Sequence, residues 1–301
     1  MEKKLMRSSL YVGGTSPARM IQAGFLEADC LVYDLEDSVP AREKDSARFL
    51  VCYAISCQRP SEKKVIVRVN GLYSEEFEKD LSAVVRVRPD AVRIPKTETA
   101  DEVRRIDEQI SKIERKDGIP EGSIRLWCNI ESWRGLLNAR EIACASPRME
   151  ALALGAEDFT ASIGARRTRE GTEILYARSM IVLACREAGI SAQDAVFSDI
   201  RDPEGFAKDL ETARTLGFDG KTCIHPSQIR PVNACFTPSQ GEILQARRII
   251  DALDRAEKEH TGVCLLDGSM VDRPMALRAR MILDRAEAAG CLRKEDLNGA
   301  Q

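Results

Sequence analysis

Histidine is scarce in this sequence, with only His225 and His260 among 301 residues. A zinc site built from several histidines is therefore excluded. Long apolar runs are also missing: none approaches the roughly 20 residues that cross a bilayer, and the N-terminal one is too short for a signal peptide. The ten cysteines stand singly, without a CxxC pair. We therefore expect free thiols in a reducing cytoplasm and no membrane segment.

Neither sign of charge is in large excess. The formal net charge is −3, the isoelectric point is near 5.7, and no polybasic stretch occurs. These values favour neither a nucleic acid nor an anionic lipid surface as a partner. A GxGxxG after a strand, a P-loop, an HExxH and a GxSxG are all absent. Apolar residues make up 44% and charged residues 31% of the chain, which is typical of a globular protein.

Short apolar runs alternate with longer amphipathic segments along the first 225 or so residues. Continuous runs of this kind are typical of parallel strands that are buried on both faces. The eight predicted strands are residues 8–14, 30–37, 64–70, 91–96, 124–132, 150–158, 195–200 and 220–225. Eight strand–helix units of this length predict an α/β fold of the (β/α)8 TIM barrel type.

The segments between the predicted strands have helical periodicity. We expect helices over residues 17–26, 42–56, 74–85, 100–116, 134–145, 171–189 and 204–217. After the last strand we expect a long helix over 239–260, a glycine-bearing loop and a final helix over 276–290. The predicted organisation is a catalytic barrel at 1–230 and a C-terminal helical extension at 231–301, which packs on the barrel or on a neighbouring subunit.

Polar residues gather where the predicted strands end, which is the end at which TIM barrels hold their active sites. They are Asp34, Glu36 and Asp37, Arg68 and Asn70, Lys96, Asn129 and Glu131, Glu157 and Asp158, and His225. A single one of these is most often a solvated charge or one half of an ion pair. Four or more carboxylates in one ring repel one another unless cations compensate them, and a hard divalent ion does so.

We therefore predict that Glu131 and Asp158, at the ends of neighbouring strands, bind Mg2+ directly. Glu36 and Asp37 would bind metal waters or handle protons. Arg68 offers a planar fork for a substrate carboxylate, and the role of Lys96 is to neutralise an acid or bind substrate. Such a set suits a 2-keto or 2-hydroxy acid. The pair Gly13 and Gly14 allows either a phosphate-binding turn or a plain tight turn.

The chain resembles the citrate lyase beta-chain group of the HpcH/HpaI aldolase and citrate lyase family. The motifs that match are RSSLYVGG, VYDLEDSVPAREKDSAR, VIVRVN, VRIPKTET, NIES, LALGAEDF, RRTREGTEILYARS, GFDGKTCIHPSQI and GSMVDRP, and they cover nearly the whole length. One departure is visible: the family usually has Val-Pro-Gly where this chain has Val12-Gly13-Gly14. The resemblance implies a metal-dependent barrel enzyme that performs a retro-Claisen cleavage of a citryl- or malyl-type thioester.

By position, the resemblance implies Mg2+ ligands at Glu131 and Asp158, a keto-acid clamp at Arg68 and the acidic pair Glu36 and Asp37. It also implies two residues that the spacing does not single out, which are Arg7 as a substrate-binding arginine and Asp272 as a tail acid that enters a neighbour's active site. Asp37 or Asp272 is the expected base. The implied partners are a CoA or acyl-carrier thioester, an acyl-carrier protein with a transferase subunit, and further copies of the chain in a trimer or hexamer.

Several alternatives remain open from the sequence. One is a stand-alone citramalyl-CoA or malyl-CoA lyase instead of a citrate lyase beta-subunit. A second is a class II 2-keto acid aldolase, which is disfavoured because no histidine precedes His225. A third is a non-catalytic scaffold subunit, which would be expected to lose its ligands, whereas Arg68, Glu131 and Asp158 are all present.

Overall fold

The computed structural model describes residues 5–258, 264–266 and 269–292. The chain divides into two compact units. The first runs from Met6 to Asn233, and the second comprises residues 1–5 and 234–301. No helix in the described ranges has the length and apolar character needed to cross a membrane.

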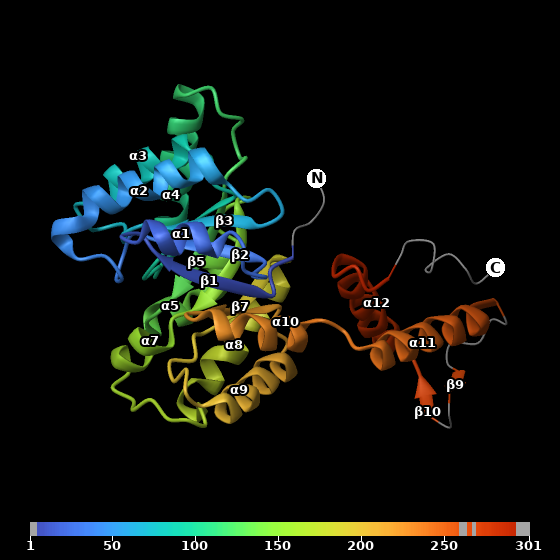
Figure 1. The fold of residues 1–301 in the computed structure, drawn as a ribbon. Helices are drawn as coiled ribbons and strands as arrows, with labels where there is room; N and C mark the ends of the chain where they lie inside the picture. The colour runs from blue at the N-terminus through green and yellow to red at the C-terminus, as the bar shows by residue number, and fades with distance from the viewer. Residues whose placement is uncertain (1–4, 259–263, 267–268, 293–301) are drawn as a thin grey trace. The chain divides into compact units, whose positions relative to one another are not determined.

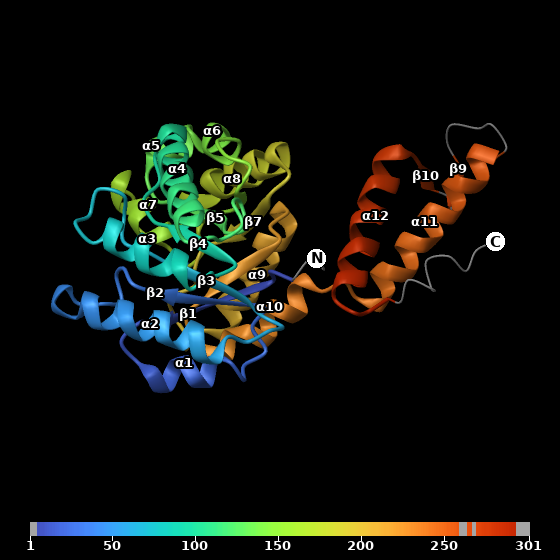
Figure 2. The ribbon, with the colours of Figure 1, turned by 90° about the horizontal axis from the view of Figure 1, so that it is seen from above.

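The first unit is a closed barrel of eight parallel strands in the order β1 to β8, with helices outside it (Figures 1 and 2). The strands are β1 (Ser8–Gly13), β2 (Cys30–Asp34), β3 (Lys64–Arg68), β4 (Ala91–Ile94), β5 (Arg125–Ile130), β6 (Met149–Leu154), β7 (Ser191–Asp194) and β8 (Gly220–Cys223). β1 also pairs with β8, which closes the sheet. The prediction of an α/β TIM barrel is confirmed.

The helices of this unit follow the strands in alternation. They are α1 (Pro17–Ala23), α2 (Lys44–Gln58), α3 (Phe77–Arg86), α4 (Ala100–Lys116), α5 (Trp133–Leu137), α6 (Ala139–Ala143), α7 (Ala156–Ser162), α8 (Leu175–Ala188), α9 (Pro203–Leu216) and α10 (Ile229–Phe236), with short 3-10 turns η1 (Ala41–Glu43), η2 (Thr172–Ile174) and η3 (Pro226–Gln228). Local signals explain their ends: Thr99 and Glu102 form a reciprocal capping box that starts α4, and Gly189 and Gly217 end α8 and α9 in the left-handed conformation.

Two sequence predictions of strand position were wrong. The seventh strand is Ser191–Asp194 and not residues 195–200, because its polar side chains are buried and paired instead of being apolar. Gln193 accepts a hydrogen bond from Ser9 at 3.2 Å inside the barrel. The sixth strand ends at Leu154, so Asp158 lies in the first turn of α7 and not at a strand end.

A layer of buried charges holds α8 and α9 to the barrel. Asp194 of β7 accepts hydrogen bonds from Arg178 of α8 at 2.9 and 3.0 Å and from Lys221 of β8 at 2.5 Å. Asp209 of α9 pairs with both cations, at 2.5 and 2.7 Å. Because every charge in this layer has an opposite partner, its burial is compensated.

The second unit contains two long helices, α11 (Gln240–Lys258) and α12 (Arg273–Ala288). They share a small core of Ile243, Ala246, Ala279, Leu283, Ala286 and Leu292. The predicted glycine-bearing loop also contains a two-stranded antiparallel hairpin, β9 (Cys264–Leu266) with β10 (Ser269–Val271), which the sequence reading missed. His260 lies outside the described residues.

The two adjacent glycines at the end of β1 have different roles. A Cβ on Gly14 would lie 2.5 Å from the carbonyl oxygen of Asp34 and 3.3 Å from side-chain carbons of Ala47 and Leu35. The amide of Gly14 also donates to that carbonyl at 3.0 Å. A Cβ on Gly13 would meet only Ser38, at 3.5 Å, which is ordinary contact. Gly14 is therefore required by the close approach of β1 to β2, and Gly13 is not.

We accordingly expect Gly14→Ala to lower the free energy of unfolding by about 1–3 kcal/mol, because the added methyl group forces the two backbones apart. The matched variant Gly13→Ala has room for its methyl group and should stay close to the wild type. Urea unfolding followed by circular dichroism measures both. Equal stabilities of the two variants would contradict this assignment.

Candidate active site at the carboxyl ends of the strands

Six predicted site residues lie on consecutive elements at one end of the barrel, called the barrel mouth below. Glu36 and Asp37 follow β2, Arg68 ends β3, Lys96 follows β4, Glu131 follows β5, and Asp158 lies on α7 after β6. Because the strands are parallel and neighbouring, these side chains are brought to the same rim. The charges of Asp158, Arg68 and Lys96 all act on Glu131, which places the four groups in one electrostatic environment.

Arg68 is the most connected residue of the mouth. Its Nε and Nη2 atoms donate to the two oxygens of Asp34 at 2.7 and 2.8 Å. Its Nη1 atom lies 2.7 Å from Glu36 and 3.5 Å from Asp37. The fork expected to grip a substrate carboxylate is thus engaged by Asp34, a residue of β2. The edge of the guanidinium group formed by Nε and Nη2 is occupied by Asp34, so a substrate carboxylate can approach Arg68 only at the edge formed by its two Nη atoms. A substrate carboxylate that binds both edges does not match this geometry.

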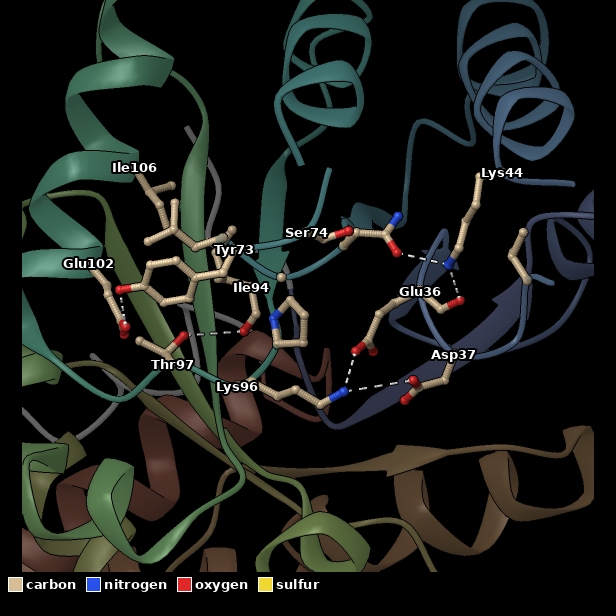
Figure 3. Close-up of a pocket in the computed structure, with 15 residues that line it drawn as sticks. Glu36, Asp37, Lys44, Tyr73, Ser74, Ile94, Lys96, Thr97, Glu102 and Ile106 are labelled. Carbon is tan, nitrogen blue, oxygen red and sulfur yellow. Dashed lines mark hydrogen bonds and ion pairs between the residues drawn. The ribbon is translucent and has the colours of Figure 1, made fainter. Parts of the chain in front are cut away.

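Glu36 joins Arg68 to Lys96. Lys96 Nζ donates to Glu36 Oε1 at 3.0 Å and lies 4.0 Å from Asp37 (Figure 3). The other carboxylate oxygen of Glu36 is buried and has no partner with hydrogen-bond geometry, although Arg68 is close to it. Burial raises the pKa of Glu36 to about 7, because its loss of hydration outweighs the attraction of Arg68 and Lys96. The structure therefore offers a carboxyl group that changes protonation near neutral pH.

Glu131 is a buried carboxylate held by neutral donors. Asn129 Nδ2 donates to its Oε1 at 2.7 Å, and the backbone amide of Lys96 donates to its Oε2 at 3.2 Å. Burial raises the pKa of Glu131; the hydrogen bond from Asn129 and the charge of Arg68 oppose that rise, and the negative charge of Asp158 adds to it. A side chain on Gly155 would overlap Glu131, so the glycine after β6 makes room for it.

Lys96 adopts an unusual backbone conformation, with φ at +51°. Such a value is uncommon for a residue with a side chain and costs free energy that the surroundings must offset. Here the twist lets the same residue direct its amide to Glu131 and its ammonium group to Glu36. The strain is therefore located where two acidic side chains from different strands meet.

Beside this cluster lies a pocket of about 510 Å³ (Figure 3). Its lining includes Glu36, Asp37 and Lys96 together with apolar Ile94 and Ile106. Tyr73 crosses it and donates from its hydroxyl to Glu102 at 3.0 Å. This volume is within the range of small-molecule sites, and the pocket opens next to the acidic side chains.

The donor set fits a hard divalent cation. Glu131 and the exposed Asp158 are oxygen donors on neighbouring elements, and the negative charge of Asp158 contributes to the raised pKa of Glu131. No ion pair to Glu131 occurs among the described residues. Over the same part of the chain, no three His, Cys, Asp or Glu side chains form a group that could hold a metal. Two protein carboxylates, with water and substrate in the remaining positions, match the usual way in which Mg2+ is bound.

Two further predicted residues lie outside this set of six. Arg7 precedes β1 and makes a two-pronged ion pair with Asp29, which precedes β2, with both contacts at 2.8 Å. It therefore lies at the amino ends of the strands, opposite the acidic cluster, which corrects its placement in the substrate site. Asp272 belongs to the second unit, where it caps α12 by accepting from the amide of Met275. The exposed His225 contacts Ser227.

Sequence reasoning missed three supporting residues. Asp34 was noticed at its strand end but not as the partner of Arg68. Lys44 Nζ donates to the carbonyls of Leu35 and Glu36 at 2.8 and 2.7 Å and to Asn70 at 2.8 Å, so it fixes the loop after β2 (Figure 3). Arg93 is buried in the barrel and donates a hydrogen bond to Asn129, the residue that holds Glu131. Its position on an inward face of β4 was the only available signal.

A TIM barrel with a ring of carboxylates, an arginine and a lysine at its mouth defines a class of enzymes that act on small acids at an oxygen-rich site. Comparison with known proteins gives the particular family. Residues 7–226 match the family model HpcH/HpaI aldolase/citrate lyase, and the chain belongs to that family. It is therefore a carbon–carbon lyase, as the sequence predicted.

Individual relatives cover almost the whole chain. It is 45% identical over 284 residues to the citrate lyase subunit beta of Escherichia coli strain K12, covering 94% of each chain. It is 35% identical over 287 residues to a (3S)-malyl-CoA thioesterase of Cereibacter sphaeroides, covering 95% of this chain and 96% of the relative. Among solved structures, protein CitE from Mycobacterium tuberculosis in complex with magnesium, acetoacetate and coenzyme A is 30% identical, with a TM-score of 0.77 over 94% of this chain and 98% of that one.

The raised pKa of Glu36 predicts a pH effect on stability. Its folded-state pKa of about 7 lies above the ordinary 4.5, so the folded chain binds more protons between these values. The stabilisation from a protonated Glu36 is complete below pH 4.5 and is lost as the pH rises through 7. In metal-free protein, Glu36→Gln should remove this loss, which is about 3 kcal/mol. Denaturant unfolding at several pH values measures it, and parallel curves for wild type and variant would contradict it.

Proposed function

We propose that this chain is a Mg2+-dependent lyase of the citrate lyase beta-subunit type, which cleaves a citryl-type thioester to an acyl thioester and a 2-keto acid such as oxaloacetate. The single observation that supports it most is the shared environment of Glu131 and Asp158 next to Arg68 and Glu36. Full-length similarity to a citrate lyase subunit beta supports the substrate class. A related structure that contains magnesium and coenzyme A supports the metal and the thioester.

In this proposal Glu131 and Asp158 hold the metal. When bound, Mg2+ supplies a Lewis acid that polarises the substrate oxygens and steadies developing negative charge. Arg68 orients a substrate carboxylate through its outer Nη atoms, since its other edge is bonded to Asp34. Lys96 limits the repulsion between the acidic side chains.

The chain's own carboxylates would move the protons. Asp37 is 60% exposed at the edge of the pocket and is our choice of base for the substrate hydroxyl. Asp272 of a neighbouring copy is the second candidate, since it lies in the tail unit. Glu36, with a pKa raised by burial to about 7, can hold a proton at neutral pH and donate it to the carbon left by cleavage. The proton that the base took from the hydroxyl is then released and Glu36 is protonated again, which restores the starting state. The products are the acyl thioester and the keto acid.

The identity of the thioester carrier separates two settings for this enzyme. An acyl-carrier protein as carrier would make it a subunit that works beside a transferase, whereas CoA would make it a stand-alone lyase. The similarity to a (3S)-malyl-CoA thioesterase favours including malyl thioesters as a second substrate class. Cys128, Cys185 and Cys223 are buried thiols without a disulfide, which supports the proposed cytoplasmic setting.

Metal binding tests the centre of the proposal. We expect the wild type to bind Mg2+ or Mn2+, and Glu131→Gln and Asp158→Asn each to abolish measurable binding, because each removes one of two anionic ligands. Isothermal titration calorimetry measures this. The matched control is Glu157→Gln, which changes the neighbouring exposed carboxylate that pairs with Arg167 at 3.2 Å. Equal losses in Glu157→Gln and Asp158→Asn would contradict the assigned ligands.

Turnover tests the reaction itself. Purified protein with Mg2+ is incubated with citryl-, citramalyl- and malyl-CoA and with a citryl acyl-carrier adduct, and keto-acid release is followed. We expect release from a citryl thioester, its loss in Asp158→Asn and its retention in Glu157→Gln. Release only from the carrier adduct assigns the chain to a multi-subunit lyase. No keto acid from any thioester would refute the proposed reaction.

A further inference from the structure

The interior of the barrel contains a cation whose burial the fold alone does not explain. Arg93 of β4 is 2% exposed. Its guanidinium group makes no ion pair with any described residue, and its Nη1 atom has no hydrogen-bond partner there. The carboxylates of Glu131 and Asp34 attract Arg93 without forming an ion pair, and the loss of hydration outweighs this attraction and lowers the pKa of Arg93. Burying a cation without such a pair is costly.

Lys221, another buried cation of the barrel interior, does have anionic partners. Lys221 is equally buried, but it pairs with Asp194 and Asp209. Arg93 instead lies over two aromatic rings, 5.1 Å from the centre of Tyr11 and 5.9 Å from that of Trp127. These rings offset part of the free-energy cost of burying the charge, but they do not fix the orientation of the guanidinium group. An apolar side chain would serve barrel packing better.

Arg93 fixes the orientation of the Asn129 side chain. Arg93 Nε donates to Asn129 Oδ1 at 2.6 Å. Since this oxygen is committed to an arginine, which can only donate, the amide cannot turn over. Its Nδ2 atom must face Glu131, and it donates to Glu131 Oε1 at 2.7 Å. Three side chains on two neighbouring strands thus form a chain of hydrogen bonds that ends on the carboxylate.

The result for Glu131 is a fixed orientation. Oε1 receives the hydrogen bond from Asn129, and Oε2 receives one from the amide of Lys96. A carboxylate oxygen can accept more than one hydrogen bond or bind a cation as well, and the negative charge of Asp158 acts on this carboxylate. Partners that hold a metal ligand from behind set its direction and strengthen its affinity for the ion.

We propose that Arg93 and Asn129 are positioning residues that orient Glu131 for a divalent cation. This inference rests on the proposed metal site, but neither residue touches the metal or the substrate. The burial of an unpaired guanidinium is then a functional requirement. A purely structural role predicts that replacing Arg93 lowers stability and leaves metal affinity unchanged, whereas positioning predicts loss of affinity in a folded protein.

The test is titration of Mn2+ into the full chain, with binding followed by electron paramagnetic resonance and folding by thermal unfolding. We expect Arg93→Met and Asn129→Leu each to weaken Mn2+ binding by about 10- to 100-fold. The double variant should lose no more than the larger single loss, because both act through one hydrogen-bond chain. Arg93→Lys keeps the charge without the guanidinium Nε and should bind as weakly as Arg93→Met.

The matched control is Thr222→Val, another change in the barrel interior. Thr222 accepts only a long contact of 3.4 Å from Arg93 Nη2 and is not bonded to Asn129, so we expect wild-type affinity. Wild-type affinity in Arg93→Met or Arg93→Lys, or additive losses in the double variant, would overturn the inference while leaving the metal site intact. If Arg93→Met fails to fold, Asn129→Leu tests the same link. Absence of Mn2+ binding by the wild type would instead refute the metal site itself.

Discussion

Repulsion among carboxylates is the constraint on which the barrel mouth depends. Asp34, Glu36 and Asp37 lie at the end of β2, and Glu131 and Asp158 follow the neighbouring strands β5 and β6 on the same rim. In a partly buried site such charges interact strongly, and each raises the cost of ionising the next. Three cations at the mouth have different partners. Arg68 is hydrogen-bonded to Asp34 and forms an ion pair with Glu36, Lys96 is hydrogen-bonded to Glu36, and Arg93 is hydrogen-bonded to a neutral amide. Glu131 therefore keeps neutral donors only.

The fold makes this arrangement possible through small residues as much as through charged ones. Gly155 leaves space for the Glu131 side chain, and Gly14 lets β1 approach the carbonyl of Asp34, from which the acidic loop begins. The lower interior is filled by Cys30, Val32, Ile66, Ala91, Trp127 and Ala151, which support the polar upper layer. Lys44 ties the loop after β2 to Asn70 of the loop after β3. The backbone that carries the acidic side chains is therefore held in place by several contacts.

The alternation of apolar runs and helices was sufficient to predict the barrel, because most of its strands are buried on both faces and have mainly apolar sequences. The position of β7 was predicted wrongly because Gln193 and Asp194 are polar. They can be buried since each has a polar or charged partner, and a search for apolar runs does not detect such a strand. Strand ends predicted Glu36, Arg68, Lys96 and Glu131 at one rim, since parallel strands share an edge. They did not predict that Asp34 occupies the fork of Arg68, because that contact is set by register between β2 and β3. Arg7 was misplaced because a motif gives a position in sequence and not an end of the barrel.

The balance of charge at the mouth also bears on the order of events under the proposed function. Not counting Lys44, which is bonded to carbonyls of the loop after β2 and to Asn70, five carboxylates against Arg68, Lys96 and Arg93 leave two negative charges when all are ionised. One divalent cation would neutralise them. A citryl thioester is itself an anion, so without that cation it would meet a rim of its own sign. Protonation of Glu36 removes only one of these two negative charges. Because the pKa of Glu36 is about 7, this protonation takes place near neutral pH. Under this proposal the metal would bind before the substrate and would neutralise the negative charge of the mouth. The orientation of Glu131, which its hydrogen bonds fix, would then determine the position of the metal.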